Sequence, residues 1–258
     1  MSTHSKRIAV VTGASSGIGR EFVFEADKLD NIDEIWVIAR RLDRLEELGE
    51  KCTHRVRPIP MDLSKEESLD EFRELLAAEC PQVGFLVNAA GFGVFGPFAG
   101  SDISKQLDSL RVNMIALVAI CHACLRYMKR GDVIVNIGSN SSWQPVPWQS
   151  VYGAGKSGVL SFSRAIGREL KKRGIHVMCV CPGWIKTEFQ DVAAHDEYIK
   201  YVDRWYGPEE VAKQAMEDLA KKKTVSILGS PVRRQVMLVK HLPVDLIMNI
   251  WCRQQGIE

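Results

Sequence analysis

Short runs of apolar residues alternate along this chain with longer stretches whose apolar positions recur every three or four residues. The runs contain the β-branched side chains that strands favour. The stretches between them place apolar side chains on one face of a helix, as Leu69, Phe72 and Leu76 do. The predicted strands are Ile8–Val11, Ile35–Ala39, Val56–Met61, Phe85–Val87, Val133–Ile137, His176–Val180 and Thr224–Leu228.

This alternation predicts an α/β fold, a Rossmann-like, doubly wound parallel sheet of about seven strands with helices on both faces. The chain has 258 residues, 46% of them hydrophobic, which is enough for one complete core. No internal repeat or low-complexity segment interrupts the pattern. We therefore expect a single domain over residues 1–258.

Helix ends are marked by residues that cap helices. We expect the first helix over Ile18–Leu29 and a capping box formed by Ser64 and Glu67 at the start of a later one. Pro208, followed by two glutamates, predicts the first turn of another helix. Two further helices are expected to run from about Ser104 to Lys129-Arg130-Gly131, and from the loop after Gln149 to Lys171-Lys172-Arg173-Gly174.

A glycine-rich loop joins the first strand directly to the first helix. Its glycines at 13, 17 and 19 let the backbone turn tightly and approach a ligand, and the helix start directs free N–H groups at an anion. A Gly/Ser cluster is about as often an ordinary turn. The functional interpretation is a pyrophosphate site made by Gly13, Ser15, Ser16, Gly17, Ile18 and Gly19.

Tyr152 and Lys156 stand four residues apart, and therefore on one face of a helix. A free tyrosine has a pKa of about 10, so proton transfer near neutral pH requires a neighbouring positive charge. Taken alone, such a pair is commonplace on helices.

Together these elements resemble the short-chain dehydrogenase/reductase family over roughly Ile8–Thr187. The resemblance implies a catalytic set of Asn113, Ser139, Tyr152 and Lys156, in an NADP-type member similar to hydroxysteroid dehydrogenases and carbonyl reductases. It also implies which residues bind the cofactor. Besides Tyr152 and Lys156, these are three residues of the segment Asn88-Ala89-Ala90-Gly91, namely Asn88, Ala89 and Gly91, and four residues after the sixth strand, namely Pro182, Gly183, Ile185 and Thr187.

The resemblance also implies a mechanism, hydride transfer at a nicotinamide. Tyr152 is expected to exchange a proton with the alcohol or carbonyl oxygen, and Ser139 to hydrogen-bond that oxygen. Lys156 is expected to lower the tyrosine pKa and hold the nicotinamide ribose, and Asn113 to support a proton-relay water. The structural alternative is that Ser139 only begins a Ser/Asn turn and that Asn113 is an ordinary polar helix residue.

The residues after the second strand bear on the choice of cofactor. An acidic residue there would bind an unphosphorylated ribose, whereas arginine pairs with a 2′-phosphate. Arg40 and Arg41 follow Ala39, so NADP(H) is favoured over NAD(H), unless these arginines only solvate a loop. Asp62 and Leu63 are expected to flank the adenine.

Aromatic residues gather around the expected opening and favour an apolar substrate, such as a hydroxysteroid or another bulky lipid-like alcohol or ketone. The alternatives are a 3-oxoacyl thioester reductase and a catalytically silent dinucleotide-binding sensor or scaffold. The resemblance divides the chain into a cofactor-binding and catalytic core over 7–187 and a substrate lid over 188–223. The aromatic residues are Phe92, Phe95, Trp143, Trp148, Trp184, Phe189, Trp205 and Tyr206.

The tail over 231–258 repeats apolar residues with a helical period that Pro243 interrupts. Two short amphipathic helices are expected. They would pack on the core, border the substrate opening, or touch a membrane surface with the help of Arg233, Arg234 and Lys240.

Composition and charge limit the possible ligands and cellular location of the protein. The net charge of +2 disfavours nucleic-acid binding. The seven scattered cysteines indicate a reducing compartment and buried thiols rather than a metal site. The longest apolar stretch, Met114–Leu125, is shorter than the roughly 20 residues that span a bilayer, so a cytoplasmic protein is expected. That stretch is also more apolar than one buried face requires. The family resemblance implies that such helices pair across a two-fold axis, so a homo-oligomer, a dimer or tetramer, is expected.

Overall fold

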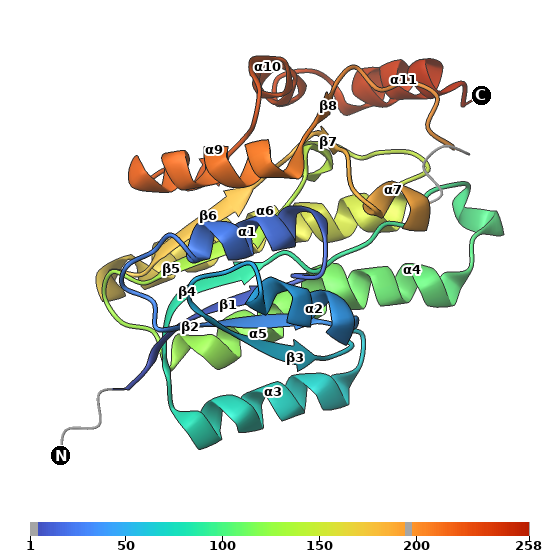
Figure 1. Cartoon of the computed structure of the whole chain (residues 1–258). Coiled ribbons are helices and arrows are strands. Elements are labelled where there is room, and N and C mark those ends of the chain that lie inside the picture. Colours follow the sequence, from blue (N-terminus) through green and yellow to red (C-terminus); the bar gives the residue numbers. More distant parts are fainter. Residues whose placement is uncertain (1–4, 194–197, 258) are drawn as a thin grey trace.

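A parallel seven-stranded sheet forms the middle layer of the structure (Figure 1). The computed structural model describes residues 5–193 and 198–257. The strand order is β3-β2-β1-β4-β5-β6-β9. These strands are β1 (Arg7–Thr12), β2 (Glu34–Ala39), β3 (Arg55–Pro60), β4 (Gln82–Asn88), β5 (Val133–Ile137), β6 (His176–Val180) and β9 (Val225–Ser226). A small second sheet pairs β7 (Trp184–Ile185) with β8 (Trp205–Tyr206).

Helices cover both faces of the sheet, as predicted (Figure 1). Successive side chains of each strand enter opposite cores. In β1, for example, Ile8 and Val10 join one cluster, whereas Ala9 and Val11 join the other. The second cluster is covered by α1 (Gly17–Ala26), α2 (Leu42–Gly49) and α9 (Pro208–Ala220), and the first by α3 (Glu66–Glu79), α5 (Leu117–Leu125) and α6 (Ser150–Glu169). A further helix, α4 (Ile103–Leu110), contacts α6.

The strand order reverses beside β1, which lies between β2 and β4. Thr12, the last residue of β1, is in register with Ile38 on one side and Asn88 on the other. The carboxyl ends of these strands therefore meet at one edge, where doubly wound sheets bind their ligands. The predicted fold class is confirmed.

Two predicted helix features are wrong. Ser64 does not form the capping box with Glu67, because its amide and hydroxyl both donate to the Asp62 carboxylate, and Lys65 becomes the N-cap of α3 without a side-chain cap. The first helix ends at Ala26 instead of Leu29. Short-range hydrogen bonds at the helix ends decide both outcomes.

The helix expected from Ser104 to Arg130 has a π-helical turn, Arg111–Ala116, between α4 and α5, and it ends at Leu125. The whole stretch Ile103–Leu125 has 23 residues and is long and apolar enough to cross a membrane by length and composition. However, Ile120, Cys121 and Cys124 are buried in the core against the sheet. It is therefore the core helix of the domain.

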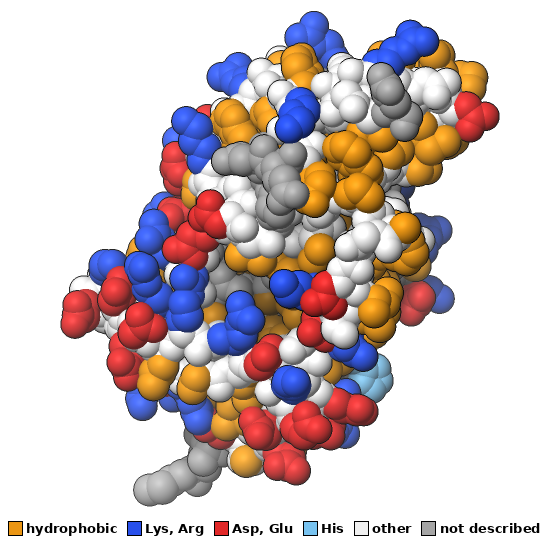
Figure 2. Space-filling view, turned by 90° about the vertical axis from the view of Figure 1, so that its right-hand side faces the viewer, with side chains coloured by type: hydrophobic (Ala, Val, Ile, Leu, Met, Phe, Trp, Pro, Cys, Tyr) orange, Lys and Arg blue, Asp and Glu red, His pale blue; other side chains and the backbone are white. Residues whose placement is uncertain are grey.

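The last third of the chain forms shorter elements. The predicted strand Thr224–Leu228 is reduced to β9, and the region before α9 contains α7 (Phe189–Val192) and β8. Residues 194–197 of the expected lid lie outside the described residues. The tail forms the two expected helices, α10 (Ser230–Val239) and α11 (Val244–Gln255), at the top of Figures 1 and 2.

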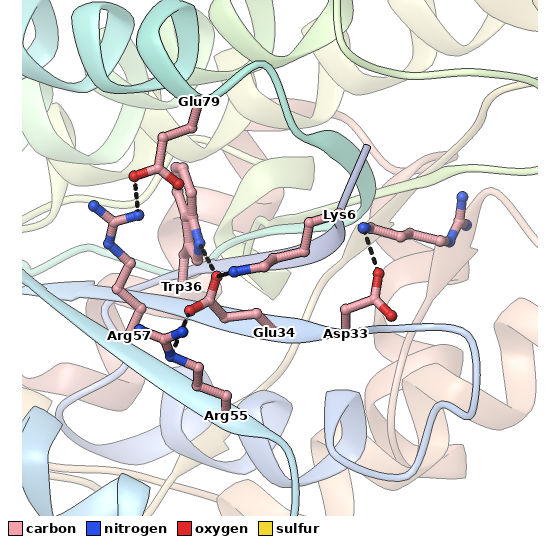
Figure 3. Close-up of polar contacts among 8 residues, drawn as sticks. Lys6, Asp33, Glu34, Trp36, Arg55, Arg57 and Glu79 are labelled. Carbon is pink, nitrogen blue, oxygen red and sulfur yellow. Dashed lines mark hydrogen bonds and ion pairs between the residues drawn. The ribbon is translucent and has the colours of Figure 1, made fainter. Parts of the chain in front are cut away.

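At the opposite edge of the sheet, Glu34 is the centre of a buried ion-pair network (Figure 3). Its carboxylate is 1% exposed and lies 2.9 Å from Lys6 Nζ and 3.1 Å from Arg55 Nε. The Trp36 indole donates to the same carboxylate at 3.2 Å. Burial alone would raise the pKa of Glu34, but the hydrogen bonds and charges of these partners outweigh it and hold the pKa below its usual value.

Replacing Glu34 with alanine is expected to lower the free energy of unfolding by about 1–3 kcal/mol, because the buried Trp36 N–H loses its acceptor. Since the folded-state pKa is depressed, the contribution of Glu34 is fully present above the unfolded pKa and is lost as pH falls through the folded value. The difference in Tm between wild type and variant should therefore shrink below about pH 4. Glu79→Ala is the control, because it removes the carboxylate paired with Arg57, which is more exposed than Glu34. An equal loss of unfolding free energy in Glu79→Ala would contradict this role of Glu34.

Candidate active site

A cleft of about 530 Å³ opens at the carboxyl ends of the strands. It is lined by all of the residues predicted to bind the cofactor except Asn88. Those that line it are Gly13, Ser15, Ser16, Gly17, Ile18, Gly19, Arg40, Arg41, Asp62, Leu63, Ala89, Gly91, Tyr152, Lys156, Pro182, Gly183, Ile185 and Thr187.

The glycine loop has the geometry of an anion cradle. Gly13 has φ +67°, and a Cβ there would lie 2.7 Å from the Ala90 backbone. A Cβ on Gly19 would overlap the carbonyl oxygen of Gly13. Ser16, the N-cap of α1, forms no side-chain cap, and the first turn carries no acidic residue. The first N–H groups of α1 are therefore available to a phosphate, which fits a dinucleotide.

Thr12 and Asn88 are the last residues of β1 and β4, next to this loop. The Thr12 hydroxyl accepts hydrogen bonds from the amides of Ala89 and Ala90, both at 3.1 Å, and so ties the end of β1 to the segment after β4. Asn88 is buried and donates to Asn136 Oδ1 at 2.9 Å, which explains why it does not line the cleft. Thr12 was not predicted as a site residue, although it directly precedes the first glycine of the loop.

Arg40 and Arg41 lie on the same side of the cleft, at the end of β2. Arg41 contacts Ser15 Oγ at 3.1 Å and the Glu188 carboxylate at 2.8 Å, so it bridges the glycine loop and the segment before α7. This pair holds the pKa of Glu188 below its usual value. Arg41 therefore meets the glycine loop with its charge paired by Glu188, and Arg40 lines the cleft next to it.

Ser139 lies just after β5, where it begins a turn and also lines the cleft. Its hydroxyl accepts from the Ser141 amide at 3.1 Å as the cap of a short 3₁₀ turn, Asn140–Trp143, and donates to Asn140 Oδ1 at 3.2 Å. It also lines the cleft beside Tyr152 and acts to lower the pKa of that phenol. The serine therefore begins a turn and faces the ligand space at once.

Lys156 is buried on α6, and its Nζ donates to the Ile137 carbonyl at 2.8 Å. Burial lowers the pKa of Lys156 to about 8, although the nearby thiols of Cys179 and Cys181 oppose the shift. Its Nζ lies 5.8 Å from the centre of the Tyr152 ring. The ammonium is thus held at the base of the cleft beside the tyrosine.

In the protein alone, burial dominates the pKa of Tyr152, and the effect expected of Lys156 remains a prediction. Burial raises the pKa of Tyr152 to about 12, and the hydrogen bond of Ser139 offsets only part of this effect. The lysine directs its ammonium group to a backbone carbonyl instead of the phenol. Tyr152 is therefore a neutral phenol at physiological pH, able to donate a proton.

Asn113 does not line the cleft but lies directly behind it. The π-helical turn directs its Nδ2 to the Phe92 carbonyl at 2.6 Å and to Ser109 Oγ at 2.9 Å. Its Oδ1 is buried without a hydrogen-bond partner and faces Gly91, close to Lys156. An unsatisfied buried acceptor beside an ammonium group fits a site for an ordered water.

Half of the predicted aromatic residues line the cleft, namely Phe92, Phe95, Trp184 and Phe189. Phe95, Phe189 and Tyr152 form a ring cluster, with centroids 5.6–6.1 Å apart. The other four do not reach it: Trp143 is stacked against Arg164 and Lys240, Tyr206 is in the core, and Trp148 and Trp205 also lie away from the lining.

Several lining residues were not predicted because they come from distant parts of the chain. Gln149 precedes α6, Val192 ends α7, and Gln235 and Trp251 belong to the tail helices. The helical period of the tail includes Trp251, but the sequence did not decide whether this residue lies beside the cleft, in the core or at a membrane surface. The tail therefore closes one side of the site.

Within 5–193 and 198–257, no group of three or more His, Cys, Asp or Glu side chains is arranged to hold a metal ion. The seven cysteines are all free thiols. Four of them, Cys121, Cys124, Cys179 and Cys181, are buried.

Comparison with known proteins identifies the family. The family model described as short chain dehydrogenase matches residues 7–198. Carbonyl reductase family member 4 of Danio rerio is 32% identical over 240 residues, which cover 90% of this chain and 96% of that protein. NADP-dependent 3-hydroxy acid dehydrogenase of Schizosaccharomyces pombe is 29% identical, covering 90% and 94%. The human 3-oxoacyl-[acyl-carrier-protein] reductase is 30% identical, covering 70% and 77%.

Among solved structures, a short-chain dehydrogenase from Sphingobium yanoikuyae has a TM-score of 0.77 at 24% identity, covering 92% of this chain and 96% of that one. This likeness confirms the fold. The chain belongs to the short-chain dehydrogenase/reductase family, as the sequence motifs predicted. It is accordingly an oxidoreductase that acts on CH–OH groups.

Proposed function

We propose that the protein is an NADP(H)-dependent oxidoreductase that interconverts a secondary alcohol and a ketone on an apolar substrate, such as a hydroxysteroid or another bulky lipid-like molecule. The observation that carries this proposal is the position of Ser139 and Tyr152 between two unlike halves of one cleft. One half has the glycine loop and arginines, and the other has the ring cluster of Phe95 and Phe189.

The bound nicotinamide supplies the hydride, and the chain supplies the proton and the orientation. Tyr152 Oη donates its proton to the carbonyl oxygen, while the Ser139 hydroxyl hydrogen-bonds that oxygen and stabilises its developing charge. Lys156 lies beside the tyrosine with a lowered pKa, and the Oδ1 of Asn113 offers an acceptor to a water behind it.

The arginines after β2 support NADP(H) over NAD(H), and one of the relatives is named as NADP-dependent. Arg40→Asp is expected to weaken NADPH binding at least about tenfold, because a charge-assisted bond is replaced by repulsion of the 2′-phosphate. NADH binding should be unchanged or tighter. Fluorescence titration with both cofactors measures this, and Arg44→Asp, an exposed arginine outside the cleft lining, is the matched control. Tighter binding of NADH than NADPH by the wild type would contradict the assignment.

The alternative substrate is a 3-oxoacyl thioester, which the human relative's name supports. A silent sensor or scaffold is the other alternative, and the complete set of Ser139, Tyr152, Lys156 and Asn113 argues against it. Loss of reduced-nicotinamide absorbance with a panel of bulky ketones and 3-oxoacyl thioesters separates these cases. Turnover of thioesters alone would favour the alternative, and cofactor binding without turnover of any carbonyl would favour the sensor.

We further propose that the protein is a cytoplasmic homo-oligomer, most simply a dimer. Ile103, Leu107 and Ile115 are exposed apolar residues along α4 and the π-helical turn, which supports pairing of this face with a second copy. Light scattering at micromolar concentration should give at least twice the mass of the 28.9 kDa chain. A monomeric mass would contradict the assembly.

A further inference from the structure

The two tail helices have an inner face that fixes them to the domain. Val232, Val236 and Ile247 are buried on it. The Trp251 indole donates to the Pro147 carbonyl at 3.0 Å, and the buried Gln255 accepts from the amides of Lys200 and Tyr201 at 2.8 and 3.0 Å. The outer face is therefore presented by a fixed scaffold.

That outer face combines exposed apolar and basic side chains. On α10, Arg233, Arg234, Met237 and Leu238 lie at helical spacing, and together with His241 after the helix they line a common shallow groove. Val244, Leu246 and Ile250 continue the apolar surface on α11. The apolar members are 44–60% exposed. Figure 2 shows hydrophobic side chains gathered over the upper part of the molecule, with Lys and Arg side chains near them.

The charges on this face are nearly all of one sign. Residues 230–255 contain Arg233, Arg234, Lys240 and Arg253 but one acidic residue, Asp245. Lys240 lies 4.1 Å from the centre of the Trp143 ring, so it is engaged with that ring and the two arginines of α10 become the principal charges of the outer face. Basic residues beside exposed apolar ones on a helix match the two requirements of an anionic lipid surface.

We propose that the outer face of α10 and α11 docks onto the surface of an anionic phospholipid bilayer. Arg233 and Arg234 contact lipid phosphates there, while Met237, Leu238 and Ile250 enter the boundary between headgroups and acyl chains. The same helices contribute Gln235 and Trp251 to the lining of the cleft. Docking therefore places one wall of the cleft at the lipid surface, so that a lipid-like substrate passes from bilayer to site; this last consequence rests on the proposed function.

Co-sedimentation of the full-length protein with vesicles tests the proposal. Vesicles of phosphatidylcholine with one-third phosphatidylglycerol should sediment the protein, and pure phosphatidylcholine vesicles should sediment much less. Arg233→Gln/Arg234→Gln should weaken binding about five-fold for each arginine removed, and raising the salt from 0.1 to 0.5 M should weaken the wild type similarly. Leu238→Ser/Ile250→Ser should weaken it at least about ten-fold, since two apolar side chains no longer enter the lipid.

Matched variants keep the proposal falsifiable. Lys171→Gln/Lys172→Gln removes two exposed charges far along the chain from the tail, and Leu42→Ser/Phe98→Ser removes two comparably exposed apolar side chains outside the proposed dimer face. Both should sediment like the wild type, and thermal unfolding should show that all four variants are folded. The proposal would be overturned if the wild type did not sediment with anionic vesicles, or if all variants sedimented equally. It would also be overturned if the tail variants lost oligomer mass while the wild type did not bind lipid, because the outer face would then be a contact between copies. Turnover of a soluble ketone without vesicles tests the proposed function separately.

Discussion

Tyr152→Phe is expected to lower kcat by about 10²-fold or more and to leave NADPH binding nearly unchanged. The substitution removes the phenolic proton but keeps the ring that packs against Phe95 and Phe189 at 5.8 and 5.6 Å. The pocket should therefore keep its shape and lose only its proton donor. Initial rates of NADPH oxidation and a fluorescence titration of NADPH measure the two quantities on the same preparation.

Phe189→Leu provides the contrasting control for Tyr152→Phe. It removes an aromatic ring from the same cluster but leaves the donor in place, so it should affect substrate KM more than kcat. Near-normal turnover of Tyr152→Phe would refute the proposed proton transfer. An equal loss of NADPH binding would show that the variant disturbs the cleft rather than the chemistry.

Gly13→Ala is expected to remove most of the NADPH binding. It should also lower the free energy of unfolding by more than the cost of a Cβ at positive φ. Gly13 has φ +67°, where a Cβ costs about 1–2 kcal/mol. Its Cβ would also lie 2.7 Å from the backbone of Ala90, so the glycine loop or the segment after β4 must move. Either movement displaces the amides that face the phosphate.

Gly256→Ala separates the two causes. Gly256 has nearly the same φ, +65°, but no atom lies within 4 Å of its Cβ position. Chemical denaturation should show a loss of about 1 kcal/mol for Gly256→Ala and a clearly larger one for Gly13→Ala. Normal NADPH affinity in folded Gly13→Ala would mean that the close approach to Ala90 is unnecessary for the cradle.

The locally encoded parts of this protein could be predicted from its sequence. Buried strands appear as apolar runs, and the predicted bounds of β5 and β6 are those of the structure. The break at Pro243 correctly separated α10 from α11. The capping box at Ser64 failed because the competing acceptor, Asp62, lies two residues away and takes both donors.

The sequence by itself indicated the fold class, the glycine cradle and the residues proposed for catalysis, because local patterns encode each of them: the alternation of strand and helix periods, the glycine spacing and the short motifs. Only the tertiary structure decided which distant segments meet. Packing turned Trp143 away from the cleft and onto Lys240, placed Asn113 behind Gly91 through a π-helical turn, and brought Trp251 beside the site. These positions follow from how helices pack over the carboxyl ends of parallel strands, which no local pattern encodes.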